Sequence, residues 1–341
     1  MSPTSTESQA PANSEDADQV RGGLGHVVRS VMYKYALVAV LLAVIGLFST
    51  VNPDVFPTFA NAQTIASTQS TIALLALAAM LPLIVGHIDI SIGFQFGLAQ
   101  GLCAYLIVNM GTSAILAVGA VLAVGLLVGL LNGVLVAKVK LDSFIVTLAV
   151  GILVLGATQW LTGDVTISGQ MPAWFLSLGR ANVAGIPLPF IYVVLACAAL
   201  WLTLEYTAWG RSCYATGGNP RAALLAGVRT ERVTIQAFLL AGLLSAISGC
   251  LSVMILGASS PTIGLGALLP AFAGAFLGAT SIRPGRYNAI GTLIAVYLVA
   301  VGITGLQQLG AASYVQQLFN GGALLIAVAL ARFAATRRSG T

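Results

Sequence analysis

The stretch GHIDISIG, residues 86–93, holds side chains that could perform acid–base or ion chemistry. Between Asp54 and Lys138, Asp89 is the only residue charged at neutral pH and His87 is the only histidine. An aspartate at the centre of a membrane helix costs about 2.5–3.5 kcal/mol to insert. Three roles are therefore open for Asp89. It accepts hydrogen bonds from amides at a broken helix end and so holds the helices before and after it in register, or it contacts a solute, or it carries a proton.

The composition places this aspartate in a lipid bilayer. Hydrophobic residues make up 58% of the 341-residue chain and charged residues 7%, and the mean hydropathy is +0.95. A soluble domain carries about 25% charged residues. The basic residues are scattered between apolar segments, which argues against nucleic-acid binding. The four cysteines are widely spaced without a C-x-x-C pair, which argues against a metal or redox site.

Charges and turn residues divide the chain into about ten predicted transmembrane helices, so the predicted fold is an all-α polytopic membrane protein. With both termini placed in the cytoplasm, 14 of the 15 Lys and Arg residues fall on the cytoplasmic side and only Arg180 falls outside. The predicted spans are 35–53, 64–86, 90–110, 113–137, 143–163, 187–204, 233–257, 264–282, 287–309 and 312–331.

The two ends of the chain differ from this body. Residues 1–32 are rich in Ser, Pro and acidic residues, which predicts a disordered cytoplasmic tail. They lack the basic start and apolar core of a signal peptide. Residues 33–333 form the predicted transmembrane domain, and 334–341 form a basic C-terminal tail.

Glycines repeat at intervals of four in the third and fourth predicted spans. Such rows allow helix backbones to approach closely in lipid, so we interpret them as helix-packing positions. GHIDIS, which precedes the first row, has neither a Pro-Gly turn nor a basic residue, and we expect the backbone to break there. The two rows are Gly93, Gly97, Gly101 and Gly125, Gly129, Gly133.

The one long internal loop, residues 205–232, contains a short helix signal. Asn219 is suited to cap the helix, Pro220 to its first position, and Gly227 to a left-handed stop. Between them RAALLA gives about two turns with an apolar surface at the cytoplasmic face. Two interpretations are open: the helix fits a groove of another protein, or it lies on the ends of its own spans.

Three segments in this order resemble the signature regions of the ribose/xylose-type permeases, which are membrane subunits of bacterial ATP-binding-cassette (ABC) sugar importers. The segments are GHIDISIG (86–93), NGVLVAKVKLDSFIVTL (132–148) and TAWGRSCYATGGNPRAALLAGV (207–228). The resemblance runs from about residue 35 to 331. It implies a type II ABC importer-like permease in the bacterial cytoplasmic membrane. It also implies pairing with a second copy or a paralogue, a cytosolic ATPase subunit, and a periplasmic or lipid-anchored sugar-binding protein.

The resemblance also implies roles for particular residues. The helix in the loop looks like the coupling helix that sits in a cleft of the ATPase. Around GHIDISIG the expected transport-path or structural residues are Asp89, Ser91, Gly93, Phe94 and Gln95. The expected coupling residues are Gly210, Arg211, Gly217, Gly218, Asn219, Pro220, Arg221, Ala222, Ala223, Leu224 and Gly227.

The chain departs from the family pattern at three places. Asp142-Ser143 stands where relatives commonly have two prolines, and His87 replaces a small residue before the Ile-Asp pair. The segment 268–291 differs from the usual acidic, Gly-Gly-rich version. These differences leave the transporter class intact and weaken the case for ribose as the solute.

No lysine of the chain follows the G-x-x-x-x-G pattern of a P-loop, so we expect it to bind no ATP itself. ATP and Mg²⁺ would be handled by the partner ATPase, and this chain would be a transport subunit without catalytic or metal-binding residues. The alternative function is a proton-coupled secondary transporter that uses Asp89.

The predicted solute is polar and uncharged, because no Lys or Arg is buried to pair with an anion. Sugars need neutral hydrogen-bonding groups beside an apolar surface, and the second and third predicted spans offer both. The candidates for lining the path are Gln63, Thr64, Ser67, Thr68, Gln69, Ser70, Phe94, Gln95 and Gln100.

Overall fold

The computed structural model describes residues 35–339, which are mostly helical. Each of the ten predicted spans corresponds to a helix or a helix pair. The predicted disordered tail, residues 1–32, lies outside the described residues. In chain order the ten are Tyr35–Val51, α2 (Phe59–Thr68) with α3 (Ser70–Ile84), α4 (Ser91–Ala104) with the π-helical turn η1 (Tyr105–Asn109), α5 (Ala114–Ala137), α6 (Ser143–Thr162), α8 (Leu188–Tyr206), α11 (Thr230–Leu256), α12 (Ile263–Gly278), α13 (Ala289–Gln308) and α14 (Ser313–Ser339).

Length and hydropathy make this a multi-pass membrane protein. Within residues 35–339, six helices are long and apolar enough to cross a bilayer. The pair α2 and α3, bent by 41° at its junction, makes a seventh if it counts as one span. The helices Tyr35–Val51 and α12 are apolar but shorter. The predicted class, an all-α membrane protein, is confirmed.

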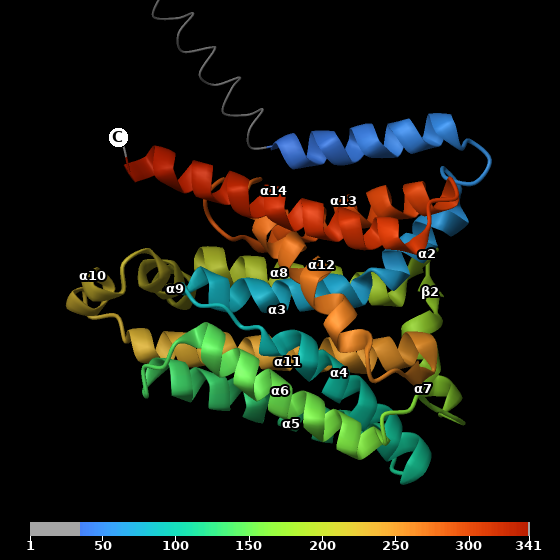
Figure 1. Ribbon diagram of the computed structural model, residues 1–341, viewed down its shortest axis with the longest axis horizontal. Coiled ribbons are helices and arrows are strands. Elements are labelled where there is room, and N and C mark those ends of the chain that lie inside the picture. Colours follow the sequence, from blue (N-terminus) through green and yellow to red (C-terminus); the bar gives the residue numbers. More distant parts are fainter. Residues whose placement is uncertain (1–34, 340–341) are drawn as a thin grey trace, which may run out of the picture.

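The centre of the molecule is α3, flanked by α11 and α12 (Figure 1). Residues 73–81 of α3 are at most 1% exposed, so this helix touches protein on every side. The α11 helix packs along α3, α4 and α5. The outer helices α5, α6 and α8 keep many exposed Leu and Ile side chains, as lipid-facing helices do.

The glycine rows act as predicted, with one difference. A Cβ on Gly125, Gly129 or Gly133 would collide with the backbone or side chains of α11. The row in α4 is shared between two neighbours, because Gly93 and Gly97 lie against Gly264 of α12 and Gly101 lies against α6. Close backbone contact therefore fixes α11 on α5 and α12 on α4.

The predicted break at GHIDIS is present. The α3 helix ends at Ile84, Gly86 takes a left-handed φ of +86°, and α4 begins at Ser91. In Figure 1 the linking segment runs back along the bundle, so α4 begins further from α10 than α3 ends.

Several small elements were not predicted. Between α6 and α8 the chain forms a short helix and paired strands, which lie at the end of the molecule opposite α10 (Figure 1). The predicted basic tail, 334–341, overlaps the end of α14, which continues to Ser339. The unpredicted elements are β1 (Ile167–Ser168) paired with β4 (Ala258–Ser259), α7 (Ala173–Arg180), β2 (Asn182–Val183) paired with β3 (Ile186–Pro187), and α9 (Ala208–Gly218). The helix that follows α9, α10 (Pro220–Leu225), is the short helix predicted in the loop 205–232.

Candidate functional site

The short helix α10 begins and ends where the sequence predicts. The Oδ1 atom of Asn219 accepts a hydrogen bond from the amide of Ala222 at 3.0 Å, and Pro220 is the first helical residue. Gly227 has a φ of +84°, a conformation that glycine adopts without strain. These local signals define a rigid two-turn element at one end of the molecule.

One face of α10 is fixed to the protein and another is free. Ala223 is 5% exposed, whereas Leu224 and Leu225 are 62% and 90% exposed. Arg221 is also exposed. Two adjacent exposed leucines at a helix end that faces away from the bundle are suited to a groove in a partner protein. Within the described chain α10 contacts α9 and the start of the span α11, and Leu224 and Leu225 stay exposed beside these contacts.

The helix α9, absent from the sequence prediction, joins α10 to the bundle. Thr207 caps its start, because Oγ1 accepts from the amide of Gly210 at 3.3 Å. A Cβ on Gly210 would overlap the backbone of Leu204, and a Cβ on Gly217 would overlap the carbonyl oxygen of Ile84. Both glycines are thus required for close packing, and Gly217 seats α9 on the end of α3.

The remaining expected coupling residues are exposed. Gly218 has no described atom within 4 Å of a Cβ built on it, so packing does not require glycine there. Arg211 and Ala222 lie at the surface of α9 and α10. The structure therefore separates the predicted set into residues that hold α9 in place and residues that face outward.

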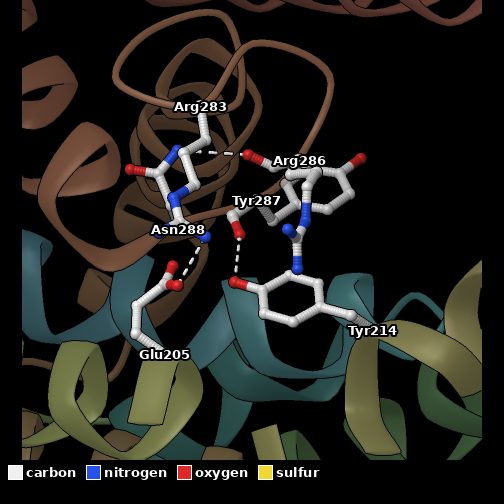
Figure 2. A network of polar contacts seen from close by, with 6 residues as sticks. All are labelled: Glu205, Tyr214, Arg283, Arg286, Tyr287 and Asn288. Atoms are coloured by element: carbon white, nitrogen blue, oxygen red, sulfur yellow. Dashed lines mark hydrogen bonds and ion pairs between the residues drawn. The ribbon is translucent and has the colours of Figure 1, made fainter. Parts of the chain in front are cut away.

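A group of side chains fastens α9 to the loop between α12 and α13, residues 279–288 (Figure 2). Arg283 Nη1 lies 2.5 Å from Glu205 Oε2, at the end of α8. The guanidinium of Arg286 lies 3.9 Å above the ring centre of Tyr214 of α9. The hydroxyl of Tyr214 donates to the carbonyl oxygen of Tyr287 at 2.8 Å. We call these five residues the loop clamp.

Two features stiffen the loop clamp. Asn288 Nδ2 donates to three carbonyl oxygens, those of Gly278, Ser281 and Arg286, while its Oδ1 accepts from the amide of Gly291 at 2.7 Å. Burial raises the pKa of Tyr214 to about 12, so its hydroxyl remains a donor throughout the physiological range. These contacts thus join the loop to α9 and to the adjoining ends of α12 and α13.

Asp89 lies at the start of α4 with no exposed surface. Its Oδ1 accepts from the amide of Ser91 at 3.0 Å and from the hydroxyl of Ser91 at 2.5 Å. Gln95 Nε2 and Asn132 Nδ2 each donate to that hydroxyl oxygen at 2.7 Å. Asp89 therefore acts at a helix start, as the first of its three possible roles requires.

The helices that Asp89 joins differ from those we expected. The polar cluster links α4 to Asn132 of α5, and the amides of Ile88 and Ile90 donate to Ser143 and Thr147 of α6. We expected these bonds to hold α3 against α4. They instead hold α4 against α5 and α6, because the segment between α3 and α4 lies against the start of α6. Within residues 35–339, Oδ2 of Asp89 has no hydrogen-bond partner.

A cavity of about 430 Å³ lies elsewhere, at the end of the bundle away from α10. It is enclosed by the α2–α3 bend, the last turn of α11, the first half of α12, α13, and the first turns of α14. Two of the predicted path residues, Thr68 and Gln69, line it.

Most of the other predicted path residues are engaged elsewhere. Phe94, the aromatic residue that we expected in the path, packs on Gly151 of α6 instead. The aromatic ring in the cavity wall belongs to Phe96. Gln63 donates to the carbonyl oxygen of Gly185, and Gln100 bridges Ser252 and Ser260. Gln95 belongs to the Asp89 cluster.

The sequence prediction missed six polar residues of the cavity: Thr71, Ser252, Thr304, Gln307, Gln316 and Asn320. A signal exists for three of them, Gln307, Gln316 and Asn320, since they are carboxamides in the last two apolar spans. Their proximity to Gln69, more than 200 positions earlier in the chain, depends on the packing of α13 and α14 against the α2–α3 bend.

The apolar helices joined at buried glycine contacts, the short exposed helix at one end and the cavity with carboxamides at the other are those of a polytopic helical membrane protein. The family model described as "Branched-chain amino acid transport system / permease component" matches residues 61–329, and the chain belongs to this family. It is a transport component rather than an enzyme.

Curated relatives extend over nearly the whole chain. The ribose import permease protein RbsC of Escherichia coli K12 is 34% identical over 303 residues, which cover 87% of this chain and 92% of the relative. RbsC of Bacillus subtilis 168 is 37% identical over 260 residues, covering 76% and 80%. The D-allose transport system permease protein AlsC of E. coli K12 is 30% identical over 301 residues, covering 88% and 91%. No solved structure matches the chain.

Proposed function

We propose that this chain is the membrane subunit of an ABC importer that carries a neutral solute of the monosaccharide class. The observation that carries the proposal is α10, a capped helix with two exposed leucines that α9 and the loop clamp hold to the body. The relatives' names, which specify ribose and D-allose, support the solute class.

The proposed topology has ten spans, with both termini in the cytoplasm. Lys138 follows α5, Arg283 and Arg286 lie in the loop clamp, and Arg211 and Arg221 lie on α9 and α10. Figure 1 places the ends of these elements, and the C-terminus, on one side of the molecule. Clustered Lys and Arg favour the cytoplasmic side. The cavity then opens toward the extracytoplasmic side, where a binding protein would deliver the solute.

The proposed mechanism starts at Leu224 and Leu225, which enter a cleft of the ATPase. ATP and Mg²⁺ are bound by that partner and supply the energy for its closure. Movement of α10 displaces α9, and the loop clamp passes this displacement to α12 and α13, which line the cavity. Rigid helices with tight glycine contacts are suited to such a shift between discrete arrangements.

The test compares Leu225→Glu with Val183→Glu, which places the same charge on an exposed residue of β2 at the opposite end. We expect Leu225→Glu to lower ATP-driven sugar uptake at least tenfold and to prevent co-purification of the ATPase, because a carboxylate is costly to bury in an apolar cleft. Val183→Glu should leave ATPase binding unchanged. Normal uptake by Leu225→Glu, or uptake by the isolated chain driven by a pH gradient, would refute the proposal.

A further inference from the structure

The residues that line the cavity indicate a binding site and not only a route through the protein. It holds four carboxamides, belonging to Gln69, Gln307, Gln316 and Asn320, together with the hydroxyls of threonine and serine. The described residues around it include no charged side chain. Its volume of about 430 Å³ falls within the usual range of small-molecule sites, about 300–1,000 Å³.

One of these carboxamides, that of Asn320, is suited to bind a ligand. Asn320 is only 6% exposed, and its Oδ1 has no hydrogen-bond partner within the described chain. A buried acceptor without a donor is unfavourable. Asn320 lines the cavity, so rotation of its carboxamide toward the cavity would let a bound molecule supply the missing donor.

The neighbouring groups are already ordered. Gln307 Nε2 donates to Gln316 Oε1 at 3.1 Å, which brings the ends of α13 and α14 together. Gln69 lies at the 41° bend between α2 and α3, and the bend turns this part of the chain toward the same space. Ser252 is held by Gln100 Nε2 at 2.7 Å. The hydrogen-bonding groups thus come from four separate helical segments.

The rest of the lining is apolar and includes Phe96, Ile263, Pro270 and Val299. Beyond the cavity, toward α10, residues 73–81 of α3 are almost completely buried. A molecule in the cavity therefore meets both apolar surface and amide groups.

These properties select a class of ligand. A carboxamide both donates and accepts hydrogen bonds, as a hydroxyl group does, so the two match in either direction. The C–H faces of a sugar ring fit apolar and aromatic surface. An ionic solute would lose its hydration without gaining a counter-charge, which is costly in a low-dielectric site.

We infer that the cavity is a binding site for one neutral polyhydroxylated solute, held by the carboxamides of Gln69, Gln316 and Asn320 against the wall containing Phe96. This inference rests on the proposed function and assigns the site at which the solute is held. Asn320 is the central residue, since its oxygen is buried and has no hydrogen-bond partner among residues 35–339.

The test uses a thiol placed in the cavity wall, Thr304→Cys, in the complete importer reconstituted with its ATPase and binding protein. All four native cysteines are buried, so a membrane-impermeant maleimide should react selectively with the introduced thiol. The probes are D-ribose, D-xylose, D-allose and D-glucose, with L-glutamate and L-lysine as charged comparators. Uptake of each is measured in the same vesicles.

We expect a transported sugar to slow labelling at least fivefold and the charged compounds to have no effect. Adding Asn320→Leu should raise the half-protecting sugar concentration at least tenfold. The matched variant Gln159→Leu, an exposed amide outside the cavity, should leave protection intact.

The outcomes separate the site from the function. If a sugar is taken up normally but never slows labelling, or protects equally well in Asn320→Leu, the cavity is not its binding site and the proposed function stands. If glutamate or lysine protects, the ligand class is wrong. If no sugar is transported and Leu225→Glu changes nothing, the proposed function itself fails.

Discussion

The hairpin formed by α12 and α13 has two very different ends. At the end near α10, the loop clamp joins it to α8 and α9 through an ion pair, a cation–π contact and a hydrogen bond (Figure 2). There Gly278 and Gly291 bring the two helix backbones into direct contact. At the other end the same helices border an open volume of about 430 Å³.

This difference explains how a displacement of the clamped end of α12 and α13 could change the shape of the cavity at the other end. Tightly packed segments transmit displacement as rigid bodies, whereas a hollow region yields to it. Residues at the clamped end should therefore affect coupling and folding, and residues at the hollow end should affect the solute. Four substitutions test this division.

The largest effect is expected from Gly217→Ala, which changes the residue where α9 packs on the end of α3. The new methyl group would overlap the carbonyl oxygen of Ile84, and backbone cannot move aside as a flexible side chain can. We expect a loss of about 3 kcal/mol in the free energy of unfolding and little folded protein. Thermal unfolding in detergent measures this. Gly218→Ala, with no described atom near its Cβ, should be at least as stable as the wild type, and equal loss in both variants would contradict the packing argument.

A smaller effect is expected from reversing the charge of Arg283 in the loop clamp. Arg283→Glu places two carboxylates together, and because Arg283 is 47% exposed, solvent limits the cost to about 1 kcal/mol. That corresponds to about a fivefold change in the population of the clamped arrangement. We expect fewer solute molecules to be imported per ATP hydrolysed. Adding Glu205→Arg should restore the ratio. A double variant as poor as the single one would show that the ion pair does not act in coupling.

Tyr214→Phe tests the hydrogen bond of the clamp while keeping the ring under Arg286. We expect a loss of about 1 kcal/mol in the free energy of unfolding. The pH dependence gives a second measurement. Burial raises the pKa of Tyr214 and of Tyr287 to about 12, above the usual value of about 10.

Because the folded-state pKa values are raised, their stabilising contribution is complete below pH 10 and is lost as the pH rises from 10 to 12. In Tyr214→Phe the contribution of Tyr214 is absent, so the decline should be shallower. A decline equally steep in both proteins would argue against a buried Tyr214 hydroxyl.

The smallest effect is expected from Asp89→Asn. An amide retains the Oδ1 acceptor for the amide and hydroxyl of Ser91, and this region lies outside the cavity. Sugar uptake and stability should stay near wild type, whereas Asp89→Ala should cost about 1 kcal/mol by removing the acceptor. Abolished uptake in a stably folded Asp89→Asn protein would show that the carboxylate takes part in transport, as the proton-carrier role requires.

The sequence alone determined the features that depend on local chemistry. Membrane location follows from composition, the helix segments from runs of apolar residues, and the start and stop of α10 from Asn219, Pro220 and Gly227. The packing role of Gly125, Gly129 and Gly133 is equally readable, because their spacing puts them on one face of a helix. Each of these signals acts within a few turns of its own residues.

Only the tertiary structure decided which distant residues meet. Phe94 and Phe96 are equivalent in the sequence, yet helix packing turns the first toward α6 and the second into the cavity. Gln69 and Asn320 line the same cavity, and Arg286 lies over the ring of Tyr214. Both arrangements depend on contacts between helices that are far apart in the chain. In a chain this rich in uniformly apolar helices, hydrophobic periodicity is too weak to orient each face, so the partner of each helix becomes known only when all of them are packed.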